Sequence, residues 1–175
     1  MPTIFTRIIE GELPGRFLWR DDVCVVFLSI NPLQTGHALV VPRAEVDHWV
    51  DLSPAINTHL MEVAQVIASA QMKAFSPTRV GLMIAGLEVP HVHIHLVPMN
   101  DLHDLDFANA DTNPDATQLD ETAVLLRQSL RDAGATSEPG KGSTFWFTAR
   151  LAQHDGQTAA RAASESPDDA AGRLR

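Results

Sequence analysis

The sequence predicts one α+β domain over residues 1–134, with an antiparallel sheet of about five strands and one long helix. Five short apolar runs bounded by turn residues predict the strands, and one long stretch with apolar residues at helical spacing predicts the helix. The 175 residues are 45% hydrophobic and 20% charged, which is typical of a globular protein with one sizeable core.

The first expected element is a short amphipathic helix, because apolar residues recur at helical spacing in residues 4–9 and Gly11 follows them. Three strands are expected next, at residues 17–20, 23–29 and 36–42. The third strand is apolar on both faces over residues 38–41, so we expect it at the centre of the sheet.

The long helix is expected to begin at Ser53-Pro54, where a capping hydroxyl precedes a proline, and to end at Ser76-Pro77. Two more strands are expected at residues 80–85 and 89–98, joined by a tight connection over 86–88. An acidic loop over residues 99–112 then leads to a last helix, from Asn113-Pro114 to Gly134.

Composition excludes several classes of protein. The formal net charge of −9 argues against a broad electrostatic grip on nucleic acid, so no nucleic-acid partner is expected. The single cysteine, Cys24, excludes an internal disulfide and is expected to be a buried thiol. No apolar run has the length of a membrane span and the start lacks a signal-peptide pattern, so we expect a cytoplasmic protein without a membrane partner.

Composition changes after residue 134, and residues 135–175 are expected to form a mostly disordered tail. Within it, residues 140–151 resemble the last glycine-rich box and strand of histidine-kinase ATP-binding domains. The rest of such a domain is missing from the sequence, so this fragment is expected to have no kinase activity.

Three histidines alternate with apolar residues near the end of the fifth expected strand. In a strand, His91, His93 and His95 would share one face at a spacing of roughly 6.6 Å, with the intervening residues in the core. Two interpretations remain open: the imidazoles share a metal ion, or one is a nucleophile and the others handle protons and phosphate. The absence of a nearby cysteine, and a Glu88 that starts on the opposite side, favour the nucleophile.

The histidine segment, residues 91–97, resembles the signature of the histidine triad (HIT) family. Residues 4–14 resemble the opening helix of that family, and residues 30–42 resemble its second landmark. The three motifs occur in the family's order and spacing over roughly residues 3–100, and they are most similar to the Hint-like branch.

The resemblance implies the HIT fold and a nucleotide hydrolase or transferase. By position His93 attacks the α-phosphate and forms a nucleotidyl-histidine, and His95 contacts the phosphate or the leaving group. His91 and His37 order the hydrogen bonds around the nucleophile. The implied substrates are nucleoside 5′-phosphoramidates or dinucleoside polyphosphates, with a purine base, and the implied assembly is a homodimer. No cofactor and no metal are expected.

The same resemblance assigns a nucleotide-binding set. Its apolar members, which wall the base pocket, are Ile4, Phe5, Ile8, Phe27, Ile30 and Leu39. Gly86 lets backbone amides approach the phosphate. Ser29 occupies the position where many relatives carry an acidic residue that holds the ribose, and Glu88 is the last member of the set.

The chain departs from the family pattern at three further positions. Leu87 stands where glutamine is usual, and Glu88 stands where serine or threonine is usual. A carboxylate there repels an incoming phosphate unless it turns away or binds a cationic leaving group. Thr6 replaces the cysteine of zinc-binding relatives. Two alternatives to the enzyme are therefore a nucleotide sensor with little turnover and, less favoured, a metalloprotein with histidine ligands.

Overall fold

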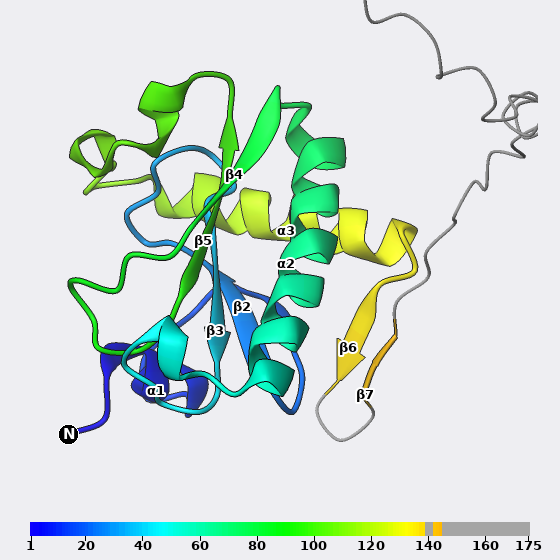
Figure 1. Cartoon of the computed structure of the whole chain (residues 1–175). Helices are drawn as coiled ribbons and strands as arrows, with labels where there is room; N and C mark the ends of the chain where they lie inside the picture. Colours follow the sequence, from blue (N-terminus) through cyan, green and yellow to red (C-terminus); the bar gives the residue numbers. More distant parts are fainter. Residues whose placement is uncertain (139–141, 145–175) are drawn as a thin grey trace, which may run out of the picture.

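The computed structural model describes residues 1–138 and 142–144. Its helices, shown in Figure 1, are α1 (Ile4–Ile9), α2 (Pro54–Phe75) and α3 (Ala116–Asp132). The strands are β1 (Phe17–Arg20), β2 (Cys24–Leu28), β3 (Ala38–Pro42), β4 (Arg79–Met83), β5 (Ile94–Met99), β6 (Thr136–Glu138) and β7 (Gly142–Thr144). Three short 3-10 helices complete the order, η1 (Trp49–Asp51), η2 (Leu102–Leu105) and η3 (Phe107–Asn109).

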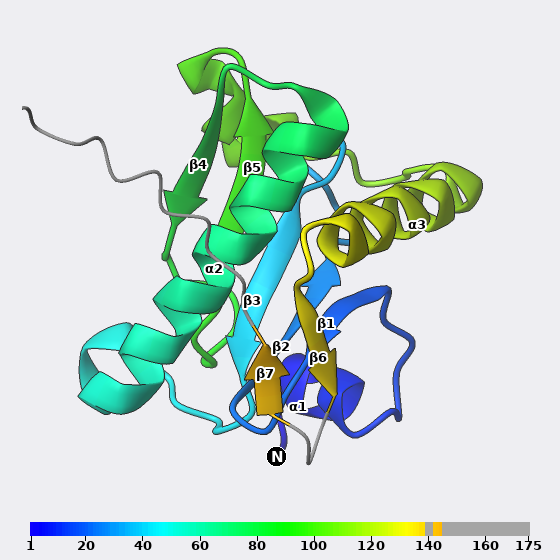
Figure 2. The ribbon, with the colours of Figure 1, turned by 90° about the vertical axis from the view of Figure 1, so that its right-hand side faces the viewer.

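The main sheet has five strands in the order β1-β2-β3-β5-β4, and every neighbouring pair is antiparallel. The α+β class and the five-stranded antiparallel sheet are confirmed. The strand over Ala38–Pro42 occupies the centre, as its two apolar faces predict. β6 and β7 form a separate hairpin, and β6 lies next to β1 (Figure 2).

The sheet separates two apolar clusters. Cys24, Val26 and Leu28 of β2 face the larger cluster, which includes residues of α2 and α3. The alternate residues, Val25 and Phe27, face a smaller cluster that includes Phe5 and Ile8 of α1. Each large apolar side chain buried in this way stabilises the fold by about 1.5–3 kcal/mol. Burial on both faces therefore makes β2 and β3 a rigid support for the residues at the ends of these strands.

The helix boundaries follow from capping groups. The Ser53 hydroxyl accepts a hydrogen bond from the amide of Ile56, and α2 ends where Ser76 adopts a left-handed backbone with φ of 50°. The sequence places the start of the last helix at Asn113-Pro114, but α3 begins at Ala116. The Asp115 carboxylate causes this shift, because it accepts a hydrogen bond from the amide of Thr117.

The strand expected over residues 89–98 is shorter in the structure, and the prediction is wrong for residues 89–93. β5 begins at Ile94, because the preceding backbone bonds elsewhere: the amide of His91 donates to the carbonyl of Val89, and the amide of Val92 donates to the carbonyl of Val46. Pro90 has no amide to donate. Only His95 of the three histidines therefore lies in the sheet, while Val92, Ile94 and Leu96 enter the core as expected.

The acidic segment 99–112, predicted as a loop, is ordered by its own carboxylates. Asp101 and Asp106 cap the two short helices η2 and η3. The side chain of Asp104 accepts a hydrogen bond from Gln34, and the amide of Asp111 donates to the carbonyl of Pro32. These bonds hold the segment against the turn before β3, as Figure 1 shows.

No helix in the described part of the chain is both long and apolar enough to cross a membrane. The kinase-like fragment over residues 140–151 lies largely outside the described residues, which include only 142–144 of it.

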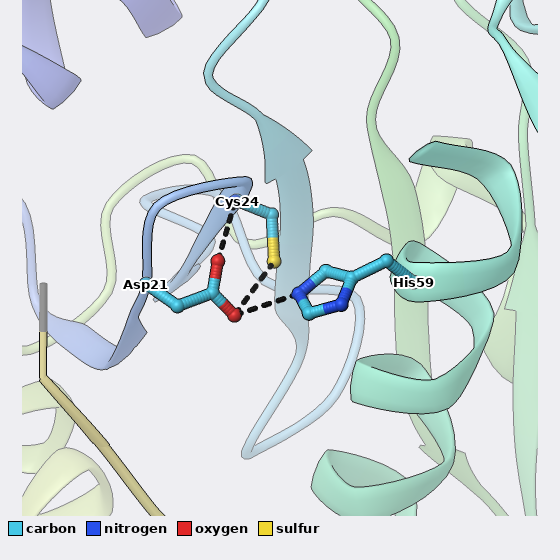
Figure 3. Close-up of side chains that lie close together, drawn as sticks. All are labelled: Asp21, Cys24 and His59. Atoms are coloured by element: carbon cyan, nitrogen blue, oxygen red, sulfur yellow. Dashed lines mark hydrogen bonds and ion pairs between the residues drawn. The ribbon is translucent and has the colours of Figure 1, made fainter. Parts of the chain in front are cut away.

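A buried carboxylate joins the β1–β2 turn to α2 (Figure 3). Oδ1 of Asp21 accepts hydrogen bonds from the amides of Val23 and Cys24, at 2.8 and 2.7 Å. Its Oδ2 accepts from Nε1 of Trp19 and from Nε2 of His59, both at 2.8 Å. These hydrogen bonds hold the pKa of Asp21 below its usual range despite burial, while burial and the neighbouring carboxylate raise the pKa of the Cys24 thiol.

We predict that Asp21→Asn lowers the free energy of unfolding by about 2–4 kcal/mol, since an amide nitrogen would face donors that need an acceptor. Urea denaturation at pH 7 measures the change. The matched control is Asp47→Asn, an exposed position, where the loss should stay below about 0.5 kcal/mol. Equal losses in the two variants would contradict the assigned role of Asp21.

Candidate active site

The candidate site is a cavity of about 400 Å³ between α1, the ends of β2 and β3, and the segment that follows β5. Most of the residues assigned by resemblance line it: Ile4, Phe5, Ile8, Phe27, Ser29, Ile30, Leu39, Glu88, His37, His93 and His95. Two assigned residues lie elsewhere. Gly86, with φ of 72°, lines an adjacent cavity, and His91 is fully buried behind the site.

His93 is oriented by a backbone carbonyl. Its Nδ1 lies 2.7 Å from the carbonyl oxygen of His91, and its ring meets the ring of Phe5 edge to face at 4.9 Å between centroids. A carbonyl oxygen can only accept, so Nδ1 carries the proton and donates. In the neutral imidazole the other nitrogen, Nε2, therefore holds the lone pair, which is the arrangement that a nucleophile needs.

His37 and His95 are linked by hydrogen bonds whose donors and acceptors can be assigned. The backbone amide of Leu33 donates to Nδ1 of His37 at 3.1 Å, so the proton of that imidazole is on Nε2. His37 Nε2 lies 3.0 Å from Nδ1 of His95 and donates to it. The remaining nitrogen of a neutral His95, Nε2, then carries a proton and can donate a hydrogen bond to a bound anion.

His91 is held from both sides. Its Nε2 donates to the carbonyl of Pro42 at 2.8 Å, so its Nδ1 accepts from the hydroxyl of Thr3, also at 2.8 Å. Glu45 completes the cluster, since it accepts from the amide of Thr3 and from the hydroxyl of Thr6. The orientation of the His91 carbonyl, and through it that of His93, thus depends on Pro42 and Thr3, which lie 49 and 88 positions away in the chain.

Sequence reasoning missed Thr3 and Glu45. The signal for Thr3 was its position directly before the first helix, where its hydroxyl caps α1 by accepting from the amide of Thr6. Glu45 offers no comparable signal, because nothing in the sequence indicates that the turn after β3 contacts the residues around α1.

Phe107 is a third residue that sequence reasoning missed. It belongs to η3, and its ring meets the ring of His95 edge to face at 5.1 Å between centroids. It lines both the main cavity and the adjacent one while remaining half exposed. No periodicity marks it, because the acidic segment is held by irregular capping bonds.

Burial keeps His37, His91 and His95 neutral. Desolvation, with smaller contributions from neighbouring imidazoles, lowers the pKa of His37 to about 4 and that of His95 to about 3. Desolvation also lowers the pKa of His91, against the opposing effect of its hydrogen bond to Pro42. Near pH 7 these three rings are therefore uncharged, as the assigned hydrogen bonds require, since each ring both donates and accepts.

Protein groups already bond to most of the imidazole nitrogens at the site. Both nitrogens of His91 and one nitrogen each of His93 and His95 already bond to protein groups. Among the described residues, the group of potential ligands whose atoms converge is instead Asp21, Cys24 and His59, where Asp21 is already satisfied by hydrogen bonds. At His93 and His95 the open nitrogens are both Nε2, and of these only that of His93 carries a lone pair, since Nε2 of His95 is protonated.

A family model described as "HIT domain" matches residues 10–102, just over half of the chain. The chain belongs to the HIT domain family. It is similar to an adenylylsulfatase of Arabidopsis thaliana, with 29% identity over 133 residues that cover 73% of this chain and 67% of the relative. It is also 33% identical over 99 residues to an adenosine 5′-monophosphoramidase of Saccharomyces cerevisiae, covering 56% of this chain and 63% of that protein.

The fold matches solved structures of the same HIT family. The crystal structure of a zinc-bound histidine triad family protein from Mycobacterium smegmatis superposes with a TM-score of 0.64 and 27% identity. The match covers 74% of this HIT domain protein and 93% of the other chain.

We predict that lowering the pH destabilises the fold already at pH values well above the pKa values of its buried histidines. Below about pH 6.5 the unfolded chain binds protons at His37 and His95, whereas the folded chain binds them only near pH 4 and 3. The free energy of unfolding should therefore fall by about 2 kcal/mol between pH 6 and pH 5. Urea denaturation at each pH measures it, and in His95→Asn the fall should be about 1 kcal/mol smaller. An equal fall in this variant would contradict the assignment.

We predict that Thr3→Val destabilises the protein by about 1–3 kcal/mol, because it leaves Nδ1 of the buried His91 without a donor and removes the cap of α1. Thr3→Ser retains the hydroxyl and should stay within about 0.5 kcal/mol of the native protein. Thermal and urea unfolding measure both variants. A valine variant as stable as the serine variant would show that the hydroxyl does not hold His91.

Proposed function

We propose that the protein is a nucleotide hydrolase or transferase that cleaves at an α-phosphate through a nucleotidyl-His93 intermediate. The observation that carries the proposal is the 2.7 Å hydrogen bond from Nδ1 of His93 to the carbonyl of His91. It leaves the lone pair on Nε2, at the wall of a cavity large enough for a nucleotide.

The proposed reaction has two balanced steps. The Nε2 lone pair of His93 forms a bond to phosphorus while the bond from phosphorus to the leaving atom breaks, and that atom keeps the electron pair. Water then forms a bond to phosphorus, the electron pair of the nitrogen–phosphorus bond returns to Nε2, and the nucleoside monophosphate departs. The hydroxyl of one water thus ends on phosphorus and its proton ends on the leaving group.

Neighbouring groups support both steps. Nε2–H of His95 is available to donate to an oxygen of the phosphoryl group as negative charge develops there. The carbonyl of His91 stabilises positive charge on His93 after attack, because it accepts from Nδ1. Both groups are set before the substrate binds, so little reorganisation accompanies the reaction.

The cavity walls suit a purine nucleoside. Phe5, Phe27 and Leu39 offer an apolar surface to a flat base, with Ile4, Ile8 and Ile30 at its edges. The Ser29 hydroxyl accepts a hydrogen bond from the amide of Asn31 and retains its proton to donate to a ribose oxygen. The names of the Arabidopsis and yeast relatives, an adenylylsulfatase and an adenosine 5′-monophosphoramidase, support adenosine as the nucleoside.

The homodimer implied by the family resemblance is part of the proposal. β4 is an edge strand of the sheet, and it carries the exposed Leu82. A groove beside it is lined by Met61, Val80 and Leu82 together with residues of α2. An apolar edge of this kind is a suitable place for two sheets to join across a two-fold axis.

We predict that the native protein releases AMP from adenosine 5′-phosphoramidate and that His93→Ala lowers kcat by at least about 10³-fold, because the nucleophile is lost. Chromatography of the released AMP measures both rates. The control is His48→Ala, an exposed histidine outside both cavities, which should retain native activity.

The alternatives give distinct results in the same assay. Equal rates for native protein and His93→Ala would reject the nucleophile. Binding of AMP without release from any nucleotide substrate would instead identify a nucleotide sensor.

A further inference from the structure

We propose that Asp21, Cys24 and His59 form a binding site for a thiophilic divalent cation such as Zn²⁺. The three side chains come from the β1–β2 turn, the start of β2 and the N-terminal half of α2, and they point toward one another (Figure 3). A cation bound there links the β1–β2 hairpin to the helix that covers it. The inference goes beyond the proposed function and does not depend on it.

The site lies on the opposite face of the sheet from the nucleotide cavity. Cys24 belongs to the larger apolar cluster, on the α2 side. The cavity walls Phe5, Phe27 and Leu39 belong to the smaller cluster, on the α1 side. The site is also separate from the position where zinc-binding relatives carry a cysteine, because that position is Thr6 of α1 in this chain.

The donor atoms of the three residues already converge. Nε2 of His59 and Sγ of Cys24 lie 2.8 and 3.8 Å from Oδ2 of Asp21, and one donor atom of each residue lies within 4.8 Å of the other two. Around a tetrahedral zinc ion, with bonds about 2.0–2.3 Å long, such atoms are about 3.3–3.6 Å apart. Side-chain rotations that move each donor atom by about 1 Å therefore suffice for all three to bind one ion.

The types of donor atom select the cation. Sulfur, imidazole nitrogen and carboxylate oxygen are the three ligand types of Zn²⁺ in proteins, whereas Mg²⁺ and Ca²⁺ prefer oxygen ligands alone. Three protein ligands leave a fourth tetrahedral position for water. The side chain of His59 is 23% exposed, so both the ion and this water can reach the site from the side of α2.

The carboxylate is held in place by groups that do not ligate the ion. Oδ1 of Asp21 accepts hydrogen bonds from the amides of Val23 and Cys24, and Oδ2 accepts from Nε1 of Trp19. These bonds remain when a cation binds, because only the contacts of Oδ2 with the side chains of His59 and Cys24 are replaced. Asp21 is thus oriented before binding, in the way that surrounding hydrogen bonds orient ligands at metal sites.

Binding exchanges protons for the cation. Burial raises the pKa of the Cys24 thiol, and the charge of Asp21 adds to this rise, whereas the nearby Arg43 guanidinium favours the thiolate. The cation therefore displaces the thiol proton to water and forms a bond with the electron pair that held it. In a neutral His59 the proton moves from Nε2 to Nδ1, and the lone pair of Nε2 binds the cation. Thiolate and carboxylate together balance the two positive charges of the ion.

The test uses Co²⁺ as a probe, because a thiolate bound to Co²⁺ gives a near-ultraviolet charge-transfer band that imidazole and carboxylate ligands do not give. Cys24 is the single cysteine of the sequence, so this band reports the proposed site even when metal also binds the site histidines. Titration of the band gives the Kd for Co²⁺. Displacement by Zn²⁺, which lacks the band, then gives the Kd for Zn²⁺.

The variants remove ligands but retain hydrogen bonds. In Cys24→Ser the hydroxyl can still donate to Asp21, but a neutral hydroxyl is a weak zinc ligand. In His59→Gln the side-chain amide can still donate to Asp21, but its nitrogen has no lone pair for a metal. His93→Gln is the matched control at the nucleotide cavity. Urea denaturation without metal verifies that each variant is folded.

We predict that the native protein binds one Co²⁺ per chain with the charge-transfer band and that Zn²⁺ displaces it. Cys24→Ser should abolish the band, since it removes the sulfur. His59→Gln should raise the Kd for Co²⁺ at least about tenfold, because one of three ligands is lost. His93→Gln should leave the band and the Kd unchanged.

Two outcomes would overturn the inference. One is a native protein that shows no charge-transfer band at Co²⁺ concentrations up to about 1 mM, which corresponds to negligible affinity. The other is a band with the same Kd in native protein and His59→Gln, which would show that Cys24 binds metal without the proposed partner. Neither outcome bears on AMP release, so the proposed function is tested separately.

Discussion

The hydrogen bond from His93 to the carbonyl of His91 is the constraint on which the site depends. It forces the proton onto Nδ1 and the lone pair onto Nε2, and no other group near His93 needs to act as a base. The carbonyl is held in turn because the His91 side chain is fixed between the carbonyl of Pro42 and the hydroxyl of Thr3. β2 and β3 pack against apolar residues on both faces, which keeps the backbone around the site rigid. This packing thereby helps to fix the orientation of the His93 ring.

The sequence predicted the fold well because the fold is encoded in local patterns. Continuous apolar runs within 23–29 and 36–42 identified the strands β2 and β3, and the Ser53-Pro54 cap identified the start of α2. It failed at residues 89–93, where Pro90 and the hydrogen bond from the amide of Val92 to the carbonyl of Val46 delay the start of β5 until Ile94. The histidines and apolar walls were named from motifs, but Thr3, Glu45 and Phe107 were not. Their roles arise from contacts between distant segments, which no periodicity records.

The chain departs from the family motifs mainly in the 85–88 loop and not at the histidines. The four histidines and the apolar walls match the family motifs, while Leu87 and Glu88 depart from them in the loop that borders the cavity adjacent to the main one. Phe107 completes that cavity from a segment beyond the matched residues 10–102. Under the proposed function, a constant set of histidines with a variable adjoining wall allows one chemistry to serve different leaving groups, since specificity is a difference between affinities.

The most direct test of this account is a measurement of the proton positions on the four imidazoles by ¹⁵N NMR of the histidine-labelled protein at pH 7. The account predicts that His93 carries its proton on Nδ1, whereas His37, His91 and His95 carry theirs on Nε2. A His93 protonated on Nε2 would contradict it, because the nitrogen at the cavity would then have no lone pair with which to attack phosphorus.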